Sequence, residues 1–175
     1  IREAGVNIAA VHYHFGSKEE LFIAVVRRVA QQIVTSQLEE LAKYENLSEP
    51  PSLENILEAF YGPPLRVITQ MGEAGVVRAQ FMGRCRAEPF PIQQLSDKEF
   101  HESQRRFLDI LQRALPNQTR TELTWKLDLA VAIIVRTANQ IGQSDKVITG
   151  NSSEEIETAI ARLVKFVAQG MRNND

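Results

Sequence analysis

The sequence has very little cysteine and no long hydrophobic run. Cys85 is the only cysteine among 175 residues, which excludes an intramolecular disulfide and fits a reducing compartment, so we expect a cytoplasmic protein. The longest uncharged apolar run, residues 129–135, is far shorter than the ~20 residues that a membrane-spanning helix needs. The first residues show no basic stretch followed by an apolar run, so we expect neither a secretory signal nor a membrane partner.

An excess of charge of one sign is also lacking. The chain has 20 lysines and arginines against 22 aspartates and glutamates, which leaves a formal net charge of −2. Any binding to nucleic acid would therefore have to be a local property of one surface. With 43% apolar and 24% charged residues, the composition is that of a globular protein, which excludes disordered and collagen-like chains.

The strict alternation of apolar and polar residues that is typical of strands is missing as well. Apolar residues recur at three- and four-residue spacing between short clusters of proline and glycine, so we expect an all-α fold. The expected helices cover residues 18–44, 53–71, 76–86, 92–115, 120–143 and 153–172. Within 53–71, Gly62-Pro63-Pro64 predicts either a bent helix or two short ones, because proline lacks the amide hydrogen and its ring clashes with the preceding turn.

Three positions have the pattern that starts a helix. Ser17, Thr119 and Ser152 are each followed three residues later by a glutamate. This spacing predicts a capping box, in which the hydroxyl accepts a hydrogen bond from the glutamate amide and the glutamate side chain reaches back. The long helix after Ser17 should bury a stripe that contains Val25 and Ile33.

The first 16 residues have the pattern of a helix-turn-helix. Ala4 and Gly5 interrupt a helical start, Asn7 stands where an N-cap would be, and a short helix then runs to Phe15 before Gly16 ends it. Small and aromatic residues without a carboxylate leave room there for a phosphate backbone. The same pattern also fits an ordinary helical corner whose apolar residues belong to the core.

Residues 3–7 and 11–21, which read EAGVN and VHYHFGSKEEL, resemble the DNA-binding end of the TetR family of bacterial transcriptional regulators. The resemblance implies an all-α fold with an N-terminal helix-turn-helix followed by a helical ligand-binding and dimerisation domain. Residues 1–45 would hold the helix-turn-helix and the connecting helix, and residues 46–175 the effector-binding and dimerisation domain. Compared with the family pattern, the chain begins within the second helix, so we expect an incomplete helix-turn-helix that lacks its first helix.

The resemblance assigns the DNA contacts to the start of the chain. The major-groove positions would be Asn7, Ile8, Ala9 and Ala10, and the phosphate-binding positions would be His12, Tyr13 and Lys18. The chemistry agrees with this division, because imidazole, phenol and ammonium groups are donors suited to phosphate oxygens, whereas Ile8 offers a base only apolar contact. We therefore expect few direct base contacts and a contribution from DNA shape.

An effector cavity is expected in the second domain. The residues suited to it are aromatic, flexible and apolar, or polar within apolar helical stretches: Phe60, Met71, Phe81, Met82, Phe107, Trp125 and Arg136. Arg136 follows the apolar run 129–135, and an anionic effector, a salt bridge or exposure to solvent would each satisfy its charge.

A dimer interface is expected on the last two helices. The run 129–135 is apolar around the whole helix, so one side would meet the core and another a partner helix. The expected contacts are Ile134, Ile156, Ile160, Leu163, Phe166 and Val167. A two-fold interface would place two recognition helices on a palindromic operator. The alternative is a central helix buried within one subunit.

Catalytic patterns are missing from the sequence. His12, His14 and His101 have no metal-ligand spacing, and the chain contains neither a phosphate-binding glycine loop nor a nucleophile elbow. We expect no enzyme, no cofactor and no metal. The sequence predicts a ligand-responsive transcriptional repressor that binds double-stranded DNA as a homodimer and is released by a small-molecule effector. The alternative is a helical protein-interaction or small-molecule carrier module without DNA binding.

Overall fold

The computed structural model describes residues 13–87, 92–141, 143, 148 and 152–173. No strand occurs among these residues. The helices are α2 (Lys18–Glu45), α3 (Leu53–Met71), α4 (Glu73–Ala87), α5 (Ile92–Ala114), α6 (Arg120–Asn139) and α7 (Ser153–Arg172). The expected all-α fold is therefore confirmed, and the helices begin and end within about one turn of the predicted bounds.

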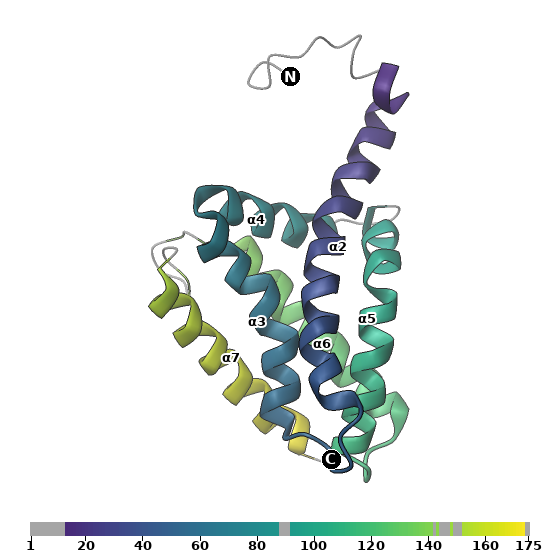
Figure 1. The fold of residues 1–175 in the computed structure, drawn as a ribbon, viewed down its shortest axis with the longest axis vertical. Coiled ribbons are helices and arrows are strands. Elements are labelled where there is room, and N and C mark those ends of the chain that lie inside the picture. The colour runs from purple at the N-terminus through teal and green to yellow at the C-terminus, as the bar shows by residue number, and fades with distance from the viewer. Residues whose placement is uncertain (1–12, 88–91, 142, 144–147, 149–151, 174–175) are drawn as a thin grey trace.

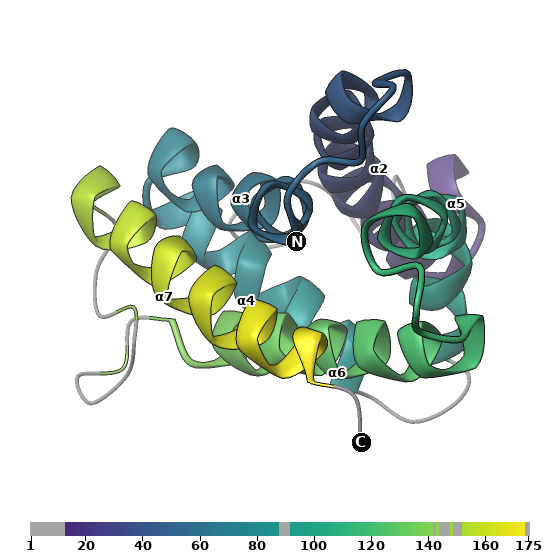
Figure 2. The same ribbon diagram turned by 90° about the horizontal axis from the view of Figure 1, so that it is seen from below.

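The helices form two sides that α3 and α4 connect. Helices α2 and α5 lie side by side on one side, and α6 and α7 lie on the other, as the two perpendicular views show (Figures 1 and 2). Helix α3 packs against α7 and α2, and α4 packs against α6 and α3. The first turns of α2 project beyond the rest of the body (Figure 1), so the start of this helix stands away from the helical core.

The core is centred on α3. Tyr61, Leu65 and Ile56 of this helix are fully buried, and Ile156 of α7 is buried with them. The Tyr61 hydroxyl donates a hydrogen bond to the carbonyl of Ala130 in α6 at 3.0 Å. Burial raises the pKa of Tyr61 far above its ordinary value, so the phenol stays protonated and keeps donating this bond.

Local signals start the helices as predicted. The Ser17 hydroxyl accepts a hydrogen bond from the Glu20 amide at 3.0 Å, and Thr119 and Glu122 form a reciprocal capping box. The Ser152 hydroxyl accepts from the amide three residues later. Each cap satisfies one of the amide donors that a helix start leaves unpaired.

The buried stripe of α2 differs from the expected one. Val26 is buried, whereas Val25 is exposed, and the polar Gln37 occupies a buried position between Ile33 and Leu41. A buried amide side chain needs hydrogen-bond partners to offset its desolvation. Those partners lie in two other helices.

Helix α3 runs through Pro63 and Pro64 without a break. Pro64 has no amide hydrogen to donate to the carbonyl of Phe60, four residues earlier. That carbonyl accepts instead from Gln37 Nε2 of α2 at 2.8 Å, and Gln37 Oε1 accepts from the Ser103 hydroxyl of α5 at 3.0 Å. The expectation of two short helices is therefore wrong. A side chain of another helix donates the hydrogen bond that the Pro64 nitrogen cannot make.

The turn between α3 and α4 brings two backbones into contact. Gly72, with a φ of 55°, ends α3 in a conformation that favours glycine. A Cβ atom on Gly75 would overlap the carbonyl oxygen of Val67 and lie 2.7 Å from the Cα of Ile68. Because the obstructing atoms are backbone, neither helix can yield without moving as a whole.

We predict that Gly75→Ala destabilises the protein by about 1–3 kcal/mol through overpacking of α4 against α3. Gly170→Ala is the matched control, since a Cβ there meets nothing within 4 Å, and it should stabilise α7 by roughly 0.5–1 kcal/mol. Thermal or chemical denaturation of both variants measures the two shifts. Equal effects of the two substitutions would contradict the close contact of α3 and α4.

Candidate functional site

The N-terminal end of the described chain holds two of the expected DNA contacts. Tyr13 is 87% exposed, and Lys18 is the exposed first residue of the projecting helix α2. The other expected contacts lie outside the described residues: Asn7, Ile8, Ala9, Ala10 and His12. A phenol and an ammonium group at the tip of a projecting helix are free to reach phosphate oxygens.

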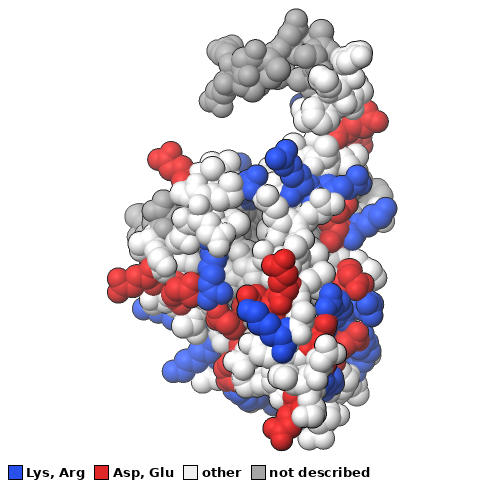
Figure 3. All heavy atoms as spheres, viewed as in Figure 1, with Lys and Arg blue, Asp and Glu red and all other residues white. Residues whose placement is uncertain are grey.

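The charge on the surface beyond the tip of α2 is mixed. Acidic and basic side chains are interspersed over the body of the molecule (Figure 3), and Glu19 and Glu20 follow Lys18 directly in the first turn of α2. Phe15 is also exposed, so among the described residues it does not pack into a core as it would in an ordinary helical corner. A negatively charged partner would therefore be attracted by single side chains and not by a broad basic field.

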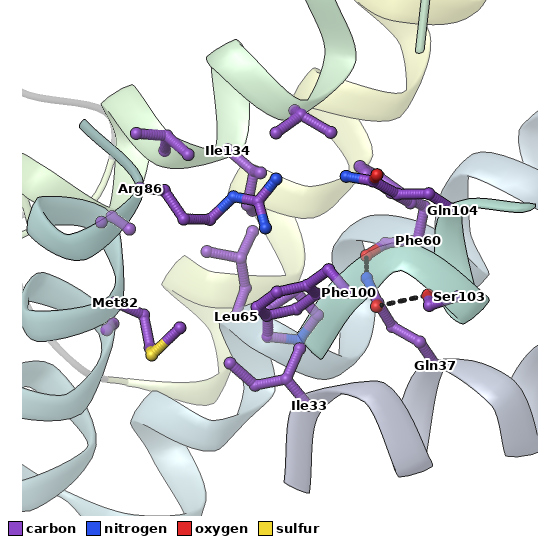
Figure 4. Close-up of a pocket in the computed structure, with 16 residues that line it drawn as sticks. Ile33, Gln37, Phe60, Leu65, Met82, Arg86, Phe100, Ser103, Gln104 and Ile134 are labelled. Atoms are coloured by element: carbon purple, nitrogen blue, oxygen red, sulfur yellow. Dashed lines mark hydrogen bonds between the residues drawn. The ribbon is translucent and has the colours of Figure 1, made fainter. Parts of the chain in front are cut away.

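A cavity of about 60 Å³ lies inside the body, between α2, α3, α4, α5 and α6. Most of its lining is apolar, and Figure 4 shows the side chains around it. The lining residues are Ile33, Gln37, Phe60, Pro64, Leu65, Ala79, Met82, Gly83, Arg86, Phe100, Ser103, Gln104, Val131, Ile134, Val135 and Ala138. An apolar cavity with a few polar groups is the usual form of a small-molecule site.

Two of the polar lining residues, Gln37 and Ser103, are hydrogen-bonded to each other. Gln37 donates to the Phe60 carbonyl and accepts from the Ser103 hydroxyl (Figure 4). Both residues are nearly fully buried. This bridge therefore fixes the positions of α2, α3 and α5 along one edge of the cavity.

Arg86 enters the cavity from the last turn of α4. Its side chain is only 10% exposed, with Nη2 3.5 Å from Asp97 Oδ1, and its guanidinium carbon lies 4.6 Å from the centre of the Phe100 ring. Nη1 is buried and has no hydrogen-bond partner among the described residues. Burial lowers the pKa of Arg86, while the charges of Asp97 and Asp128 oppose that shift. Arginine stays protonated in proteins, so the cavity contains a cation with an unused donor.

The structure brings only Phe60 and Met82 of the expected effector residues to this cavity. Phe107 is core, with its ring centre 5.1 Å from that of Phe60, and Phe81 packs on Phe22 of α2. The remaining three are exposed: Met71, Trp125 and Arg136. Arg136 is therefore solvated, which is one of the three expected ways to satisfy its charge.

The polar residues of the cavity did not enter the sequence prediction. Gln37 lies four residues from Ile33 and from Leu41, and Ser103 lies between Phe100 and Phe107 on the buried side of α5. A polar residue at helical spacing within an apolar stripe was the available signal. The same signal marks Arg86, which follows Met82 and Ala79 at helical spacing.

Most of the expected dimer contacts lie inside the protomer. The four buried ones pack in the core, which α7 forms mainly with α3: Ile156, Ile160, Leu163 and Val167. Ile134 lines the cavity. Phe166 is 68% exposed, and Trp125 and Leu129 of α6 are exposed as well. Of the expected contacts only Phe166 is exposed, and we name it together with two exposed apolar residues of α6 the α6–α7 patch: Trp125, Leu129 and Phe166.

The described residues offer no membrane span and no metal site. None of their helices combines the length and the hydropathy needed to cross a bilayer. Their histidine, cysteine, aspartate and glutamate side chains form no group of three that could hold a metal ion.

We predict that Gln37→Leu destabilises the protein by about 1–3 kcal/mol, because the Phe60 carbonyl then loses the donor that replaces the Pro64 amide. Gln31→Leu, at an exposed position of the same helix, should change stability by less than about 0.5 kcal/mol. Urea denaturation compares the two variants. A Gln37→Leu variant as stable as the control would show that the bridge contributes nothing.

Two family models match the chain. Residues 58–170 match the Tetracyclin repressor-like, C-terminal domain, and residues 1–25 match the Bacterial regulatory proteins, tetR family. No curated protein matches the sequence. The first match includes every cavity-lining residue outside α2, and the second includes every expected DNA contact. The chain therefore belongs to the tetR family of bacterial regulatory proteins and is a DNA-binding transcriptional regulator.

Proposed function

We propose that the protein is a cytoplasmic, homodimeric repressor that binds a palindromic operator and is released by a small-molecule effector. In this proposal residues 1–45 carry the DNA-binding helix-turn-helix and the connecting helix. Residues 46–175 carry effector binding and dimerisation. The expected DNA contacts keep their roles, with Asn7 to Ala10 facing bases and His12, Tyr13 and Lys18 holding phosphates.

One observation supports this proposal above all others, namely that α2 belongs to both sites. Ile33 and Gln37 in the second half of α2 form part of the cavity wall. The same helix begins at Lys18, next to the expected DNA contacts, and its first turns stand clear of the body (Figure 1). A shift of α2 at the cavity therefore moves the DNA-binding end directly.

The mechanism follows from two arrangements of the cavity helices. An effector that fits one arrangement better than the other shifts the population toward it. Because α2 is bonded to α3 and α5 through Gln37, a change in their packing alters the separation of the two DNA-binding ends in a dimer. An effector with equal affinity for both arrangements would leave operator binding unchanged.

The α6–α7 patch supports the homodimer. Trp125, Leu129 and Phe166 are large apolar side chains exposed on two neighbouring helices, and both helices lie on the side away from α2 (Figure 2). A patch there leaves the projecting ends of both subunits free for DNA. Contiguous exposed apolar surface commonly marks a protein interface, whereas single exposed apolar side chains are normal, so the proposal requires these three side chains to meet the partner together.

We predict that Phe166→Glu weakens the dimer by about 2 kcal/mol or more, because a carboxylate would have to be buried in an apolar interface. Val77→Glu is the matched control, since Val77 is similarly exposed at 65% but lies on α4. Light scattering over a dilution series gives the mass of each variant. If the two variants dissociate alike, or not at all, the interface lies elsewhere.

The operator is tested by selecting bound duplexes from a random pool with the full-length protein at two salt concentrations. We predict recovery of a palindromic site, and weaker binding of that site by Lys18→Ala, with the salt slope reduced by about one unit. Lys43→Ala, at the opposite end of α2 where Lys43 pairs with Glu40, should leave both unchanged. A folded dimer that selects no site would favour the carrier or interaction module.

A further inference from the structure

We propose that the ligand of the cavity is a short aliphatic monocarboxylate whose carboxylate pairs with Arg86. The proposal rests on the proposed function, in which this cavity takes the effector, and it adds the chemical class of that effector. The apolar chain of the ligand would lie among Leu65, Val131 and Ile134.

The unused donor of Arg86 is the first argument. Nη1 is buried without a partner among the described residues, and the carboxylate of Asp97 reaches only Nη2, at 3.5 Å and from a half-exposed position. The guanidinium points into the cavity between Leu65 and Ile134 (Figure 4). A buried cation that is incompletely paired is costly, and an entering anion removes that cost. The planar guanidinium matches the geometry of a carboxylate.

The rest of the lining limits the ligand to one polar end. Gln37 and Ser103 use their side chains in the bridge to the Phe60 carbonyl. The amide of Gln104 points toward the Arg86 guanidinium (Figure 4), so it adds a polar contact at the same end of the cavity. The other lining side chains are apolar. A second charged or hydroxylated end of the ligand would be desolvated there without partners.

The volume suits a short chain. The cavity of about 60 Å³ has room for more than one water molecule, so a ligand with a few carbon atoms fits beside the guanidinium. Butanoate, with a carboxylate and three further carbons, is such a ligand.

A phosphate fits the cavity less well. A dianion with three acceptor oxygens needs several donors, whereas the lining supplies one free arginine donor and the Gln104 amide. A neutral amide of the same length offers its carbonyl oxygen to Nη1 but no negative charge to pair with the guanidinium. Phosphate and such an amide therefore serve as probes that should bind more weakly than the carboxylate.

The test is isothermal titration of the full chain without DNA, using butanoate, butanamide and inorganic phosphate as separate probes. We expect butanoate to bind at least about tenfold more tightly than either other probe. Arg86→Met should weaken butanoate binding on the order of 10- to 100-fold, because a charge-assisted hydrogen bond is lost. Arg84→Met, an exposed position on the same helix, should bind as the wild type does.

Two further variants keep the test decisive if Arg86→Met fails to fold. Arg86→Lys retains the charge without the planar pair of donors. We expect this variant to bind butanoate more weakly than the wild type does, but still more tightly than the variant itself binds butanamide. Ala138→Leu adds bulk to the apolar wall and should abolish butanoate binding while Arg86 is intact. Equal binding of butanoate and butanamide, tighter binding of phosphate, or binding that ignores both positions would overturn the proposal.

Failure of this inference and failure of the proposed function give different results. Ligand binding is measured without DNA, and operator selection is measured without ligand. A protein that selects an operator but ignores butanoate remains a regulator with another effector. A protein that binds butanoate through Arg86 and selects no operator has the ligand assigned here without the repressor function.

Discussion

The arrangement of the helices depends on a single buried side chain, Gln37. Its amide donates to the Phe60 carbonyl that Pro64 leaves without a partner and accepts from Ser103, so one residue holds α2, α3 and α5 together. At Pro64 the bridge replaces the hydrogen bond that the α3 backbone lacks, because Gln37 of a neighbouring helix donates to the Phe60 carbonyl. A buried hydrogen-bond network of this kind favours one packing of its helices.

The cavity beside this bridge arises from residues that occupy little space where helices meet. Pro64, Ala79, Gly83 and Ala138 line it, and a Cβ on Gly83 would already lie 2.9 Å from Asn139 Oδ1 of α6. Helices α4 and α6 are therefore in contact there, while the larger side chains around them leave the centre unfilled. An unfilled centre and an incompletely paired Arg86 both cost stability, and proteins commonly retain such costs at binding sites.

The sequence predicts the helices and their starts better than the site they enclose. The capping residues act within four positions, so Ser17 and Thr119 were sufficient to place α2 and α6. Which residues face a cavity depends on how helices rotate against each other, and the choice of aromatic residues missed that: Trp125 lies on the surface, whereas Arg86 lies inside. The sequence pattern marks the α7 stripe as apolar. The same pattern fits packing on α3 of its own chain, which the structure has, and packing on a partner subunit.

The energies at the cavity match the task of moving α2. An effector that binds one arrangement 100-fold more tightly shifts the equilibrium by about 2.8 kcal/mol, at 1.4 kcal/mol for each factor of ten. The two hydrogen bonds of Gln37 contribute about 1 kcal/mol each. In the proposed mechanism, a preference of that size is comparable in free energy with the bridge that fixes α2, which lies a few side chains from Arg86 in the same cavity. Under the proposed mechanism, a contact of ordinary strength is therefore enough to exchange one packing of α2 for another, and no long chain of coupled residues is needed between the ligand and the helix that carries Lys18.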